Sequence, residues 1–259
     1  MPTRTGYRPG VPCWVDLASP DLPVSAAFYE ALFGWRAVFD SGAETGLYGR
    51  FVQDGKLVAG IGPTFAPGRP SAWNTYFATA DAVSVAEKVQ EAGGRVQVGP
   101  AQVSDEGTMA VLEDPQGASF LVWEPVRHQG AQLMDEPVAL CRSELACRDP
   151  EEARTFYREV FGWSARGASR GRGGARDEWL VDGRPIAGLL PLGESYSGAE
   201  APHWLPVFAV TDCDAGADQA ARCGGAVLRA PHELPAGRYA VLADACGAAF
   251  AVLTPDPGR

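Results

Sequence analysis

Residues 28–35 read FYEALFGW and residues 156–163 read FYREVFGW, so the chain carries one motif twice, 128 positions apart. Residues 54–60 (DGKLVAG) return at the same spacing as residues 182–188 (DGRPIAG). Farther along the chain the spacing is 131, where Trp73, Asp81 and Pro100 correspond to Trp204, Asp212 and Pro231. The repeated segment is over a hundred residues long, so an internal duplication sets the architecture.

The 259 residues suffice for two domains, each with its own core. We place the first domain at residues 11–125 and the second at residues 138–255. A linker at residues 126–137, polar and bounded by prolines, separates them.

The composition, 46% hydrophobic and 21% charged, is that of an ordinary globular protein. A net charge of −10 argues against nucleic acid as a partner, since phosphate backbones require basic surfaces. No apolar run approaches the roughly 20 residues that span a bilayer, and the first residues lack the apolar core of a signal peptide. We therefore expect no membrane partner and a cytoplasmic location.

Each copy divides into two similar units. In the first, residues 13–18 alternate like a strand, Asp21 and Pro23 open a helix, and Gly34 closes it. Three strands follow, and the same order returns from Trp73. The sequence thus predicts an α+β fold made of four β-α-β-β-β units in tandem.

These units resemble the vicinal oxygen chelate superfamily, which includes glyoxalase I, extradiol dioxygenases, fosfomycin-resistance enzymes and bleomycin resistance proteins. The resemblance rests on the DLxxxxxFY, LFGW, DGxxxAG and DPxGA patterns and spans residues 11–255. The chain looks most like a two-domain branch labelled glyoxalase-like or hydroxylase. The resemblance implies that each pair of units forms a half-barrel around a cleft, so we expect two clefts.

The resemblance also implies where metal ligands would stand, usually as His or Glu. Those positions hold Trp14, Asn74 and Leu121 in the first copy, and Arg142, Leu205 and Ala251 in the second. None offers the imidazole or carboxylate that Zn²⁺, Fe²⁺ or Mn²⁺ requires. We therefore expect no metal and no cofactor, with a site of His203, His232 and Glu233 as the alternative.

Two acids share the expected cleft-facing side of the first strands. Alternation places Asp16 beside Trp14, and Glu144 beside Arg142. Either carboxylate could act as a general base or hydrogen-bond a ligand. The alternative is an acid that merely pairs with a neighbouring arginine or lies at a solvent-exposed rim.

Aromatic side chains on the predicted strands suit a flat organic ligand. The candidate ligand-binding residues are Trp14, Tyr48, Trp73, Tyr76, Trp204 and His232. His232 could also serve as an acid–base group in the second cleft. Because Arg142 replaces Trp14 in the second copy, we expect the better apolar pocket in the first.

Three functions remain open on these grounds. The leading interpretation is metal-independent binding of a small aromatic or polyketide-like molecule, in antibiotic resistance or secondary metabolism. The second is an enzyme, a lyase, isomerase or hydroxylase-like catalyst that uses Asp16 or Glu144 as its base. The third is a protein interaction module with a degenerate cleft. A monomer and a homodimer are both compatible with the sequence.

Overall fold

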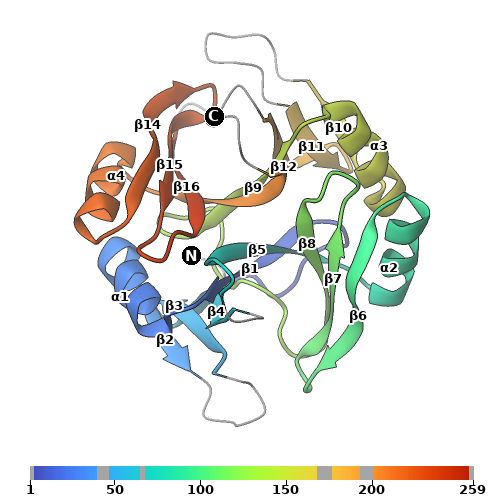
Figure 1. Ribbon diagram of the computed structural model, residues 1–259, viewed down its shortest axis with the longest axis horizontal. Coiled ribbons are helices and arrows are strands. Elements are labelled where there is room, and N and C mark those ends of the chain that lie inside the picture. The colour runs from blue at the N-terminus through green and yellow to red at the C-terminus, as the bar shows by residue number, and fades with distance from the viewer. Residues whose placement is uncertain (1–2, 40–46, 65–67, 168–176, 193–200, 257–259) are drawn as a thin grey trace.

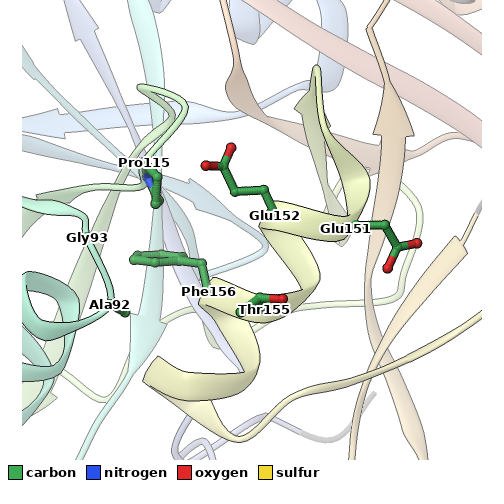
Figure 2. A pocket seen from close by; sticks show the side chains of 7 residues that line it. All are labelled: Ala92, Gly93, Pro115, Glu151, Glu152, Thr155 and Phe156. Carbon is green, nitrogen blue, oxygen red and sulfur yellow. The ribbon is translucent and has the colours of Figure 1, made fainter.

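The computed structural model describes residues 3–39, 47–64, 68–167, 177–192 and 201–256. These residues form two eight-stranded sheets and four helices (Figure 1). The first half of the chain contributes β1 (Pro12–Ser19), α1 (Leu22–Phe33), β2 (Arg36–Phe39), β3 (Gly49–Gln53), β4 (Lys56–Pro63), β5 (Ala72–Ala78), α2 (Ala82–Glu91), β6 (Arg95–Val103), β7 (Gly107–Glu113) and β8 (Ser119–Pro125). The second contributes β9 (Leu140–Cys147), α3 (Pro150–Phe161), β10 (Ser164–Arg166), β11 (Asp177–Val181), β12 (Arg184–Pro191), β13 (His203–Ala209), α4 (Cys213–Arg222), β14 (Ala226–Leu234), β15 (Gly237–Ala243) and β16 (Ala249–Pro255).

The two sheets have the same topology. The strand order is β2-β3-β4-β1-β5-β8-β7-β6 in the first and β10-β11-β12-β9-β13-β16-β15-β14 in the second. The opening strand of each copy lies at the centre, parallel to β4 or β12 and antiparallel to β5 or β13. This confirms the predicted α+β fold with tandem β-α-β-β-β units.

Aspartate and glycine residues that recur in both copies cap α1 and α3. The side chain of Asp21 accepts the Val24 amide, and Asp149 caps α3 in the same way. Gly34 and Gly162 end the helices in the left-handed conformation, with φ of 75° and 71°. The helix boundaries therefore follow directly from the local sequence.

The hydrophobic cores do not follow the order of the chain. One core joins residues of β1, α1 and β3 to Phe208 and Phe250 of β13 and β16. The other core joins α2, β7 and β8 to α3, β9 and β12. Accordingly, α1 lies beside α4 and α2 beside α3 (Figure 1). Each core is thus shared between the two copies.

The Gly-Gly pairs after α2 and α4 allow this close approach. A Cβ on Gly94 would lie 2.6 Å from the Glu113 carbonyl oxygen and 2.9 Å from the ring of Phe156. A Cβ on Gly225 would lie 2.8 Å from the ring of Phe28. No side chain fits at either position, so glycine is needed in both copies for the two copies to pack against each other.

A hydrogen-bonded relay crosses each shared core. Trp73 Nε1 donates to Tyr29 Oη at 2.8 Å, and Tyr29 Oη donates to Asp244 Oδ2 at 3.2 Å. The second relay runs from Trp204 through Tyr157 to Asp114, at 2.9 and 3.1 Å. The Tyr of each FYxxxFGW motif thus joins its own sheet to a turn of the other copy.

The stretch between the copies packs on the first sheet. The Ala131 amide donates to the Cys13 carbonyl at 2.8 Å, and the Gln132 amide to the Leu57 carbonyl at 2.8 Å. Ala131 is fully buried. Residues 126–137, expected to act as a linker, therefore also form part of the packed structure.

Candidate functional site

The helix-free face of each sheet carries the acids singled out by the sequence. Val15 and Leu17 of β1 point into the core under the helices, so Trp14 and Asp16 point to the opposite face. We call this opposite face the inner face of each sheet. The first is represented by Trp14, Asp16, Tyr76 and Trp123, and the second by Arg142, Glu144, Val207, Tyr239 and Leu253.

Asp16 is held by three side-chain donors. Tyr76 Oη donates to Asp16 Oδ2 at 2.6 Å, Asn74 Nδ2 to Oδ1 at 2.8 Å, and Tyr48 Oη to Oδ2 at 3.3 Å. Burial raises the pKa of the Asp16 carboxyl above its ordinary value, although these hydrogen bonds oppose the shift. Of the predicted site residues, Trp14, Asp16, Tyr48 and Tyr76 are thus brought together, because Trp14 Nε1 also donates to Tyr48 Oη.

The last glycine of the DGxxxAG motif makes room for this network. A Cβ on Gly60 would lie 2.0 Å from Tyr48 Oη and 2.7 Å from Asp16 Cβ. At the equivalent place in the second copy, a Cβ on Gly188 would lie 2.5 Å from Arg142 Nη2. The motif was visible in the sequence, but its role depends on side chains from other strands.

His128 also joins the first inner face. Its ring lies 4.5 Å from that of Trp14 and 5.6 Å from that of Trp123, both edge-on, and its carbonyl accepts Trp123 Nε1 at 2.7 Å. Burial, with the charge of Arg50 as a smaller cause, lowers the pKa of the imidazole to about 4. No strand or helix pattern surrounds His128, so nothing in the sequence marks it as part of the site.

We expect His128 to make the protein acid-sensitive. Its folded-state pKa of about 4 lies below the unfolded value of 6.5, so its contribution to stability is complete above pH 6.5 and is lost as the pH falls towards 4. The loss can reach about 3 kcal/mol. Urea unfolding of the wild type and His128→Leu at pH 4 to 7 measures it, because all other groups titrate in both proteins. A constant difference in unfolding free energy across that range would contradict the prediction.

Glu144 is the buried acid of the second inner face. Its side chain is 1% exposed, and its Oε2 accepts Tyr239 Oη at 2.7 Å. Its Oε1 lies 3.3 Å from Arg142 Nη2, so the pairing with arginine considered from the sequence is present here. The ring of His232 packs edge-on against Tyr239 at 5.7 Å, which brings His232 next to this group. Tyr239 and Glu144 are 95 positions apart, and alternation within one strand could not pair them.

The expectation that Trp73 and Trp204 line the clefts is wrong. Both belong to the shared cores, where each indole donates to a tyrosine of the relays described above. Trp73 lies opposite Leu17 in the sheet register, on the helix side. The physical reason is the pleat: Tyr76 and Asn74 take the inner-face positions of β5, which leaves Trp73 to the core.

The expected ligand positions do not fit a metal ion. In the sheet register Trp14 lies opposite Tyr76, which lies beside Leu121. The equivalent row of the second sheet is Arg142, Val207 and Ala251. The expectation that Asn74 and Leu205 belong to these rows is therefore wrong by one residue pair. Asn74 lies opposite Asp16, and Leu205 lies opposite Glu144. Neither row holds an imidazole or carboxylate.

The alternative metal site also lacks support within the described residues. They contain no group of three His, Cys, Asp or Glu side chains placed to hold a metal ion. Glu233 forms an ion pair with Arg238 at 3.0 Å, and His203 Nδ1 lies 2.8 Å from the Ala201 carbonyl. Among the described residues, His203, His232 and Glu233 do not form a metal-ligand group.

Fold and motifs together define the class of protein. The family model of the glyoxalase/bleomycin resistance protein/dioxygenase superfamily matches residues 13–122, and that of the glyoxalase-like domain matches residues 142–253. The chain belongs to this superfamily and contains two of its domains in tandem.

Among individual proteins, the chain is 40% identical to the anthracycline biosynthesis protein DauV of Streptomyces sp. strain C5 and to DnrV of Streptomyces peucetius. Each match covers 96% of this chain and 94% of the relative. The crystal structure of the Mn(II)-bound glyoxalase from Novosphingobium aromaticivorans shares the fold, with a TM-score of 0.62 at 15% identity over 96% of this chain and 89% of that one. In the part of this chain that the structure describes, no helix is long and apolar enough to cross a membrane.

Proposed function

We propose that the protein binds a small aromatic, polyketide-like molecule without a metal ion, as part of secondary metabolism. The observation that carries this proposal is the row of central inner-face residues: Trp14, Tyr76 and Leu121 in one sheet, and Arg142, Val207 and Ala251 in the other. The side chains of the first row stack and exclude water, and neither row holds an imidazole or carboxylate where the resemblance to the superfamily places metal ligands.

The relatives support the class of ligand. DauV and DnrV are named as anthracycline biosynthesis proteins, and anthracyclines as a chemical class are polyketides that contain fused aromatic rings. A planar ring system suits inner faces built from aromatic and aliphatic side chains with a buried carboxylate in each. The ligand proposed here is therefore of the same chemical class.

Metal content and ligand binding test the proposal together. Untagged protein is dialysed against Mn²⁺, Fe²⁺, Ni²⁺ and Zn²⁺ in turn, and the bound metal is measured by mass spectrometry. An anthracycline is then titrated by calorimetry with and without EDTA. We expect far less than one metal per chain and an affinity that EDTA does not change. About one tightly held metal per chain, or binding abolished by EDTA, would overturn metal-independent binding.

The buried acids favour a second candidate, an enzyme that uses Asp16 or Glu144 as a general base. Asp16 is only 6% exposed and its pKa is raised by burial, which brings a carboxyl closer to the range useful for proton transfer. Asp16→Asn and Glu144→Gln separate the two functions. Loss of turnover with retained binding in either variant would establish catalysis, whereas no turnover by the wild type on ligands that it binds would support binding alone.

A further inference from the structure

The two inner faces differ in the size of the side chains along their paired central strands. Along the paired central strands of each sheet, the first face presents Tyr76, Leu121 and Trp123, and the second presents Val207, Ala251 and Leu253. Every one of these replacements is smaller. Other inner-face exchanges run the other way, since Leu205 stands where the first sheet has Asn74, Glu144 where it has Asp16, and Tyr239 where it has Met109, but the Tyr239 hydroxyl is committed to Glu144.

The first inner face is also covered by the chain itself. The ring of His128 packs edge-on against Trp14 and Trp123, and Ala131 is tied to Cys13 by a backbone hydrogen bond. Tyr7 adds a further layer, because its hydroxyl donates to the Ala131 carbonyl at 2.5 Å. Trp14 and Trp123 are 3% and 6% exposed, and Val207, Ala251 and Leu253 of the second face are as deeply buried, at 0%, 0% and 5%, so the two faces differ in what lies against them rather than in exposure. His128 thus occupies the position against these rings that a flat ligand would need.

The two inner faces also differ in how completely their polar side chains are hydrogen-bonded. On the first face, both Asp16 oxygens accept side-chain donors and Trp14 Nε1 is bonded to Tyr48. On the second face, Arg142 replaces Trp14, and its Nε is buried with no hydrogen-bond partner. Its Nη2 contacts Glu144, so the guanidinium is anchored at one end. A buried N–H of a charged group without an acceptor is costly, and an oxygen from a bound molecule would satisfy it.

We infer that the second inner face is the ligand site and that Arg142 Nε binds an oxygen acceptor on the aromatic ligand. The acceptor is a ketone or quinone carbonyl or an ionised phenol, any of which a guanidinium N–H recognises. Glu144 contacts the guanidinium and is itself bonded to Tyr239, and Val207, Ala251 and Leu253 are smaller than the first-face residues at the equivalent positions. The inference rests on the proposed function and reverses the expectation that the first copy holds the better pocket.

Calorimetric titration with an anthracycline aglycone tests the assignment. Arg142→Met keeps the length and apolar stem of the side chain but removes its donors. We expect it to weaken binding roughly 10- to 100-fold, the effect of losing a hydrogen bond from a charged group. The matched control is Arg50→Met, which removes an arginine paired with Glu106 at 3.6 Å in the first half of the chain and leaves the affinity within about twofold. Arg142→Gln serves as a second variant if Arg142→Met does not fold.

The outcomes separate this inference from the proposed function. Wild-type affinity in a folded Arg142 variant, or a loss of binding in Arg50→Met instead, would overturn the assignment to the second face while leaving aromatic ligand binding intact. If the wild type bound no aromatic polyketide, the proposed function would fall and the assignment with it.

Discussion

The first half of the chain, residues 1–130, is expected to fail to fold as a stable monomer when expressed alone. Its aromatic residues Phe28, Phe33 and Trp35 pack against Phe208 and Phe250 from the second half, with ring centroids 5.2 to 6.2 Å apart. Each large side chain returned to water costs roughly 1.5–3 kcal/mol. Exposing several of them would cancel most of the about 5–15 kcal/mol that stabilises a typical domain.

Circular dichroism, dye binding to exposed apolar surface and size-exclusion chromatography with light scattering measure this result. The control is co-expression of residues 1–130 with residues 131–259, which restores both shared cores and should give a one-to-one complex that unfolds cooperatively. A monomeric first half with its own cooperative unfolding transition would show that the shared cores are not required for folding.

Trp73→Ala is expected to lower the free energy of unfolding by about 3–5 kcal/mol, the usual cost of removing a large buried aromatic. Trp73 packs edge-on against Tyr29 and Trp35 at 5.3 and 6.4 Å, and its indole N–H is bonded to Tyr29. The substitution leaves a cavity in a core that both copies build, and it frees the Tyr29 hydroxyl from one partner. Urea unfolding followed by circular dichroism provides the measurement.

Tyr29→Phe is the matched variant, since it removes only the hydroxyl that links Trp73 to Asp244. We expect a smaller loss of about 1–3 kcal/mol, because the indole N–H and the carboxylate are left without their shared partner. If Trp73→Ala instead unfolded like the wild type and lost ligand affinity, Trp73 would be a ligand-contacting residue after all.

Motifs of local origin were readable from the sequence. Asp21, Pro23 and Gly34 specify the start and end of α1 by capping and turn geometry alone, and the helix runs accordingly from Leu22 to Phe33. Alternation along β1 placed Trp14 and Asp16 on one face, and the structure gives them a common partner in Tyr48. These predictions depend only on residues within a few positions of each other.

The sequence did not reveal which face of a strand is buried in the core, or which distant residues contact each other. Trp73 and Tyr76 lie three positions apart on β5 and point to opposite faces, and the pleat alone does not say which face is the core. His128 lies in a stretch without periodicity and reaches the first inner face only because residues 126–131 fold back over the first sheet. Tyr239 meets Glu144 across strands that are far apart in the chain.

The sequence by itself determined the duplication, the four β-α-β-β-β units, the helix ends and the lack of His or Glu at the expected ligand positions, because each is a property of residue identity and local spacing. Only the tertiary structure decided that the cores are shared between the copies and that Trp73 and Trp204 belong to those cores. It also decided that His128 packs on the aromatic rings of the first inner face, whereas Arg142 lies beside Glu144 on the second. The physical reason is that burial and hydrogen bonding are satisfied by whichever side chains the fold brings together, and most of these partners are tens to hundreds of residues apart.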